Sequence, residues 1–192
     1  MTATGYESTF RLHTSDSLRA AALVLIPVVL LAAGSAAAAA MALVSGGTWL
    51  LRYYAASRTQ DVMGQLVFIA AGAFSAFDVY QVIWWLDLAV HFVTTATVTL
   101  LLFDVATHRK ILRPPSNSAE EHKIAGWLLV NGTLAAVLWE IGEWAGYFLI
   151  SRSIGVGISD SITDLLAGML GIVLAVCWIK RIRSFGRACE SA

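Results

Sequence analysis

LRAAALVLIPVVLLAAGSAAAAAMALV, residues 18–44, is the stretch that decides the fold class. It contains a single charged side chain and is longer than the roughly 20 apolar residues that one transmembrane helix needs. The whole chain of 192 residues has the same character: 58% of the residues are hydrophobic, only 14% are charged, and the mean hydropathy is +0.71. Soluble domains carry about 25% charged residues. The sequence therefore predicts an all-α fold, a polytopic transmembrane helical bundle.

Four more apolar segments follow the first, which gives five predicted spans. Their boundaries are 18–44, 62–77, 82–105, 123–150 and 160–179. They form one transmembrane domain over residues 18–180, between a polar segment, 1–17, and a basic tail, 181–192. In a six-span alternative, the first apolar region divides near Gly34-Ser35 into two helices of only about 16 residues, which is short for a span. A cleavable signal peptide is a further alternative, although the apolar stretch is longer than such peptides have.

The basic residues orient the predicted bundle, because cytoplasmic segments carry an excess of Lys and Arg. With five spans and a cytoplasmic C-terminus, ten Lys and Arg residues lie inside. Only Arg11, Arg19 and Arg152 lie outside. We therefore expect a multi-pass protein of the cell membrane, surrounded by membrane lipids. The formal net charge of zero gives no electrostatic reason to expect a nucleic-acid partner.

Six ionisable residues lie inside or at the ends of the apolar segments, where a charged side chain costs at least about 2.5–3.5 kcal/mol at mid-helix. They form three pairs, each three or four residues apart and so on one helix face. The pairs are Asp87 with His91, Glu140 with Glu143, and Asp160 with Asp164. At 1.5 Å per residue, all six fall within about 15 Å of the predicted outer face of the membrane. Three helix faces that carry polar groups at one depth predict a single site.

The cation balance indicates what such a site would hold. Arg152 is the only nearby Lys or Arg for five carboxylates and one histidine. Unpaired buried carboxylates either take up protons or hold a cation. Carboxylate and imidazole ligands suit zinc, manganese or iron. We therefore hypothesise a divalent metal ion, bound by the six residues and open toward the extracytoplasmic side, with Glu140 or Glu143 as the catalytic general base.

Simpler interpretations exist for several of these residues. Asp160 follows Ser159 at the start of an apolar run and fits a helix N-cap, and Asp164 fits the first-turn helix dipole. Asp87 fits an interfacial position, and His91 fits a core histidine with a hydrogen-bond partner. Glu140 and Glu143 are the hardest to explain in this way, because they lie inside an apolar helix.

Three motifs in this order resemble the YjdF-like family of bacterial inner-membrane proteins. They are Asp87/His91, Glu140/Glu143, and Asp160/Asp164 with Gly168 and Gly171. The resemblance covers about residues 75–180 and implies an inner-membrane location. The layout is more distantly similar to VanZ-like proteins. It departs from them at Leu88, where that family has a lysine, and at Glu143, where it tends to have a glutamine. That likeness implies a link to the cell envelope.

Three functions are consistent with this sequence. The first is a metal-dependent membrane enzyme that acts on a lipid or lipid-linked substrate. The second is a small transporter, in which the carboxylates bind cations or protons. The third is a structural subunit of a membrane complex. A homo-oligomer is open in each case. The almost wholly apolar inner half of the predicted spans favours a local binding site over a conduit.

Overall fold

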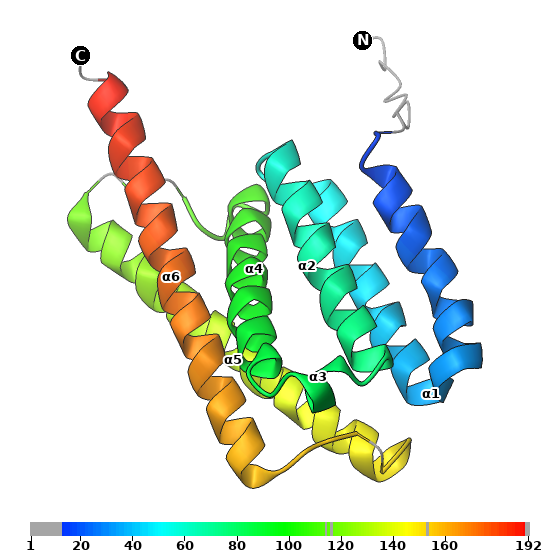
Figure 1. Ribbon diagram of the computed structural model, residues 1–192. Coiled ribbons are helices and arrows are strands. Elements are labelled where there is room, and N and C mark those ends of the chain that lie inside the picture. Colours follow the sequence, from blue (N-terminus) through cyan, green and yellow to red (C-terminus); the bar gives the residue numbers. More distant parts are fainter. Residues whose placement is uncertain (1–12, 114, 116, 153, 191–192) are drawn as a thin grey trace, which may run out of the picture.

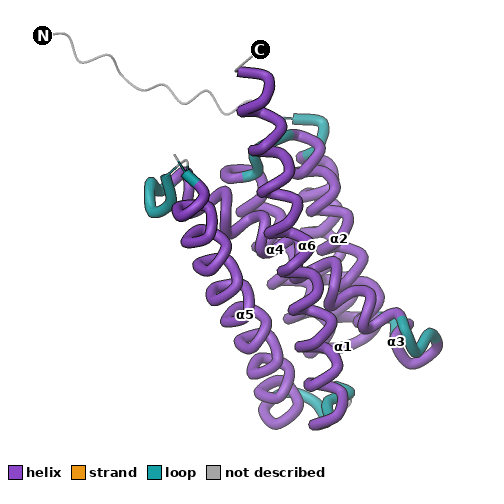
Figure 2. Tube along the Cα trace, turned by 90° about the vertical axis from the view of Figure 1, so that its left-hand side faces the viewer, coloured by secondary structure: helices purple, strands orange, loops and turns teal. Residues whose placement is uncertain are grey.

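The chain folds into helices and short connecting loops, which confirms the predicted all-α class (Figures 1 and 2). The computed structural model describes residues 13–190 except 114, 116 and 153, and for residues 182–190 it describes the backbone alone. The helices are α1 (Asp16–Tyr54), α2 (Arg58–Ala76), α3 (Val79–Val82), α4 (Leu86–His108), α5 (Ser118–Leu149) and α6 (Ile158–Glu190). No strand occurs in the described part of the chain.

Four of these helices, α1, α4, α5 and α6, are long and apolar enough to cross a membrane. Many of their large apolar side chains are exposed, among them Leu31, Val130 and Leu170. In water this surface would be strongly unfavourable, whereas in lipid it needs no cover. The chain is therefore a multi-pass membrane protein.

Helix α1 reverses direction at Gly34, so the prediction of one continuous span over residues 18–44 is wrong. A straight helix would place Asp16 and Arg52 about 54 Å apart, yet the Asp16 carboxylate lies 3.2 Å from the Arg52 guanidinium. Gly34 has φ 87° and ψ −174°, a backbone conformation essentially confined to glycine. The two arms of α1 run side by side in opposite directions (Figure 1). The division falls at the glycine at which the six-span alternative divides the first apolar region, although α2 is not among the helices long and apolar enough to count as a span.

The reversal brings the first described residues and the C-terminal end of α6 to the same end of the bundle (Figure 1). The two arms of α1, residues 16–33 and 35–54, are about 27 and 30 Å long, close to the thickness of a bilayer's hydrocarbon core. Helix α5 has 32 residues and is about 48 Å long, and it crosses the bundle obliquely (Figure 1). Helix α6 continues to Glu190, so the backbone of the predicted basic tail is helical through that residue.

A buried ion-pair network ties the two arms of α1 to α2 near the end that carries the termini. The Arg19 side chain is 1% exposed. It donates hydrogen bonds to Asp16, at 2.9 Å, to Asp61 on α2, and to the Thr48 carbonyl oxygen, at 3.0 Å. Arg52 completes the network through Asp16, so two arginines face two aspartates. Sequence analysis had counted Arg19 as an outside residue and had not linked it to Asp61.

The conformation of Gly34 can be tested by adding one methyl group. Gly34→Ala should lower the free energy of unfolding by about 1–3 kcal/mol, because the strain comes from the backbone alone and a Cβ would meet no atom within 4 Å. Gly46→Ala is the matched control: its Cβ also meets nothing, but its backbone is helical, so the change should be neutral or slightly stabilising. Equal melting temperatures for the two variants in detergent would contradict the reversal at Gly34.

Candidate metal centre

The first turns of α4 place Asp87 and His91 on one helix face. The four-residue spacing puts the two side chains one turn apart, and His91 Nε2 lies 3.6 Å from Asp87 Oδ1. The His91 side chain is 12% exposed, and that of Asp87 is 30% exposed. His91 therefore lies inside the bundle, and Asp87 lies at its opening.

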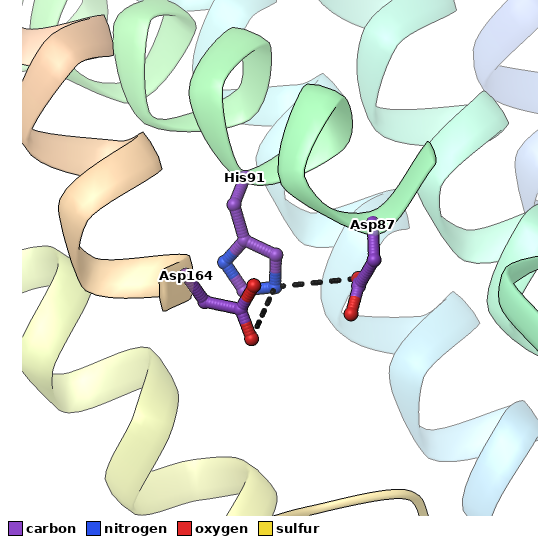
Figure 3. A group of neighbouring side chains, drawn as sticks. All are labelled: Asp87, His91 and Asp164. Carbon is purple, nitrogen blue, oxygen red and sulfur yellow. Dashed lines mark ion pairs between the residues drawn. The ribbon is translucent and has the colours of Figure 1, made fainter. Parts of the chain in front are cut away.

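Helix α6 packs closely on α4 and brings Asp164 to the same point. The approach depends on Gly171, where a Cβ would lie 2.1 Å from the carbonyl oxygen of Phe92. Asp164, two turns before Gly171, is 2% exposed, and its Oδ2 lies 3.9 Å from His91 Nε2. Figure 3 shows both aspartates directed toward this one ring nitrogen. The other oxygen of Asp164, Oδ1, is buried and has no hydrogen-bond partner.

Helix α5 supplies the glutamates on the other side of the imidazole. Glu140 is 8% exposed, and its Oε1 lies 3.9 Å from His91 Nδ1. Glu143 lies one turn away on the same face of α5. The donor atoms of His91, Glu140 and Glu143 lie within 4.8 Å of one another, as do those of Asp87, His91 and Asp164. His91 belongs to both groups, so five residues from three helices form one cluster.

The distances within the cluster show that His91 does not form a hydrogen bond with any of the carboxylates that face it. Separations of 3.6–3.9 Å are longer than the 2.7–3.2 Å of a hydrogen bond. A protonated imidazole carries a single positive charge, which is too little for four carboxylates. The spacing is compatible with a cation among the side chains. Two donor atoms that each lie about 2.0–2.2 Å from one metal ion are themselves separated by up to about twice that distance.

Asp160 differs from the other predicted residues. Helix α6 begins at Ile158, so Asp160 lies in the first helical turn and is not the N-cap that the sequence suggested. It is exposed, and it belongs to neither of the two groups of close donor atoms. The structure therefore brings Asp160 into neither close group, and its position suits an interaction with the helix dipole, so its role as a ligand stays a prediction.

Two further features lie at this end of the bundle, and sequence analysis had not found them. Trp144 Nε1 donates a hydrogen bond to Ser161 Oγ, at 3.1 Å, which links α5 to α6 beside the cluster. An open apolar groove of about 430 Å³ lies between the same turns of α4 and α6. Its walls include Leu88, Phe92, Leu166 and Leu170. Helix periodicity predicts which faces of a helix are apolar, but it does not predict where two neighbouring helices leave a gap between their apolar faces. The sequence therefore could not indicate the groove.

A family model described as "Predicted membrane protein (DUF2238)" matches residues 17–184. The chain belongs to the DUF2238 family. The YjdF-like proteins are that family, so the resemblance found in the sequence motifs is confirmed. The match includes both arms of α1, which the motifs did not reach. No protein with a curated annotation and no solved structure matches the chain. The family description assigns no activity, so the function has to be argued from the cluster itself.

The contact between α4 and α6 can be tested at Gly171. Gly171→Ala should destabilise the protein by at least about 1–3 kcal/mol, because its Cβ would collide with the backbone of Phe92, which has no rotamer to change. Gly142→Ala on α5 is the control, since a Cβ there would meet nothing within 4 Å. Thermal unfolding in detergent measures both. A Gly171→Ala protein as stable as Gly142→Ala would contradict this packing.

Proposed function

We propose that a divalent metal ion binds to one ring nitrogen of His91 inside the membrane, with its other ligands taken from the surrounding carboxylates of Asp87, Glu140, Glu143 and Asp164. The observation that supports this proposal is the position of His91, whose two ring nitrogens face carboxylates from α4 and α6 on one side and from α5 on the other. The orphaned Oδ1 of the buried Asp164 gives independent support, because a buried carboxylate oxygen without a donor is strongly unfavourable unless the group is protonated or a cation is bound.

The ligand types favour zinc, manganese or iron. Imidazole suits all three metals, and carboxylates add the hard oxygen ligands that manganese and iron prefer. If Asp87, His91 and Asp164 are the ligands, Glu140 and Glu143 are free to accept a proton from a metal-bound water. Such a metal would also polarise an ester or phosphoryl oxygen. This division of roles fits a hydrolytic or transfer reaction better than permanent storage of the ion.

The surroundings of the cluster favour a lipid-type substrate. The groove between α4 and α6 is lined by apolar side chains and opens on the outer surface of the bundle, at the turns that carry Asp87, His91 and Asp164. Its volume of about 430 Å³ lies in the range of small-molecule sites, about 300–1,000 Å³. An acyl chain in this groove would lie at the level of the cluster, although none of the five cluster residues lines the groove. We therefore propose a metal-dependent enzyme that acts on a lipid or lipid-linked substrate.

Metal analysis tests the proposal. Wild-type protein equilibrated separately with zinc, manganese and iron should retain at least one of them through gel filtration, and Asp164→Asn or His91→Ala should weaken that binding by more than about tenfold. Bound metal should also raise the melting temperature of the wild type and not that of Asp164→Asn.

Asp104→Asn is the control for this experiment. Asp104 also lies in α4, but it accepts a hydrogen bond from Gln60 on α2 and lies outside the cluster. This variant should bind metal like the wild type. Wild-type protein that retains none of the three metals would overturn the proposed function.

The orientation of the bundle is part of the proposal. Among the described residues, Arg152 is the only Lys or Arg at the end that carries the cluster, since the reversal of α1 moves Arg19 to the other end. The positive-inside rule then places the cluster on the extracytoplasmic side of the inner membrane and the C-terminus in the cytoplasm.

Cysteine labelling in intact cells tests this orientation. In a chain without Cys177 and Cys189, Ser35→Cys should react with a membrane-impermeant maleimide, and Ser118→Cys should react only after lysis. The opposite labelling pattern would contradict the proposed orientation.

A further inference from the structure

Arg152 follows the end of α5 and has an unusual environment for the single basic residue at the cluster end of the bundle. Its side chain is exposed, and its guanidinium carbon lies 4.5 Å from the ring centre of Tyr147 and 4.9 Å from that of Phe148. Such cation–π contacts at an exposed site modestly favour this position of the guanidinium.

The charge of Arg152 is not used to neutralise the cluster. Among the residues that the structure describes, no carboxylate lies within ion-pairing distance of Arg152, although Glu143 lies one helical turn before Tyr147 on the same helix. At the other end of the bundle, by contrast, Arg19 pairs directly with Asp16 and Asp61. The one cation near the cluster therefore has its charge available for a ligand.

The aromatic rings beneath Arg152 are held in place by both helices that flank the cluster. Trp144 stacks on Phe148, with ring centres 5.8 Å apart, and meets Tyr147 edge to face at 6.1 Å. The Trp144 indole N–H is bonded to Ser161 on α6. The platform under Arg152 thus joins the end of α5, which carries the glutamates, to the start of α6, which carries Asp164.

A guanidinium that lies over aromatic rings keeps the N–H donors at its edge free. Those donors match the oxygens of a phosphate group in spacing and direction. Tryptophan and tyrosine favour the headgroup level of a bilayer, where lipid phosphates lie. A cluster that binds a metal through carboxylates would also need a separate cation for an anionic substrate.

We propose that Arg152 binds the phosphate of a phosphate-bearing lipid, which is the substrate class of the neighbouring cluster. This inference rests on the proposed metal-dependent function and adds the chemical group that the substrate must carry. The acyl part of such a lipid remains in the hydrocarbon layer, and its phosphate lies between Arg152 and the cluster.

Lipid binding by the purified full chain tests the inference, with native mass spectrometry as the measurement. The probes are phosphatidylglycerol and a diacylglycerol with the same acyl chains. Wild type should bind phosphatidylglycerol roughly tenfold more tightly than diacylglycerol, and Arg152→Gln should lose that preference. Arg152→Lys should retain part of it, because lysine keeps the charge and loses the fork of donors.

Arg113→Gln is the matched control, since Arg113 is exposed in the loop at the opposite end of the bundle. It should bind both lipids like the wild type. Equal loss of the preference in the Arg152→Gln and Arg113→Gln proteins would overturn the inference, as would a wild type that does not distinguish the two lipids. Inorganic phosphate should displace the lipid only weakly, and displacement at the affinity of the lipid itself would overturn the assignment to a lipid.

The metal content of the same samples separates this inference from the proposed function. Arg152→Gln should hold as much metal as the wild type, because Arg152 contacts none of the proposed ligands. Metal in both samples with no dependence of lipid binding on Arg152 would refute the head-group contact alone. A phosphate preference that depends on Arg152, in a wild type without metal, would refute the metal site.

Discussion

The main physical constraint on the cluster is the free-energy cost of burying carboxylates in a membrane interior, which cannot solvate them. Glu140 and Asp164 are 8% and 2% exposed, and Asp87 and Glu143 complete a set of four carboxylates around one imidazole. An unpaired ion in such surroundings costs several kcal/mol even after relaxation. The packing that produces the cluster is nevertheless specific. Helices α4 and α6 lie so close together that only a glycine fits at position 171. Protonation or a bound cation can offset this cost, and the proposed metal ion would supply the cation.

The two ends of the bundle provide an internal comparison. Near the termini, Arg19 and Arg52 face Asp16 and Asp61, so two positive charges match two negative ones. That network joins three helical segments and has an evident structural role. At the other end, four carboxylates meet one histidine, and the only arginine that the structure describes there lies over aromatic rings. This contrast between the two ends is the reason to propose a ligand for the second set of carboxylates.

Sequence reasoning found the fold class and five of the residues in the cluster, because both follow from local rules. Apolar length predicts spanning helices, and spacings of three or four residues place Asp87 with His91 and Glu140 with Glu143 on single faces. It preferred one continuous first span, which is wrong, because the Gly34 reversal depends on one backbone conformation and on contacts between residues far apart, such as Arg19 with Asp61. Asp160 lies in the first turn of α6 and outside the two close groups of donor atoms, and a shared helix face does not reveal this difference from Asp164.

The site also bears on the choice between an enzyme, a transporter and a structural subunit. A conduit would need polar side chains through the whole membrane, whereas the packing of α4, α5 and α6 beyond the cluster is dominated by apolar residues such as Leu128, Ile172 and Val176. A purely structural cluster would be expected to balance its charges, as the Arg19 network does. A local metal site that faces the membrane and its head groups is consistent with both observations.

Anomalous X-ray diffraction from crystals of metal-loaded protein, recorded at the absorption edge of the bound metal, tests this account most directly. The account predicts an anomalous peak within bonding distance of His91 and of at least two of the carboxylates Asp87, Glu140, Glu143 and Asp164. Crystals with His91 and the carboxylates in the same arrangement, and no anomalous peak among them, would contradict it.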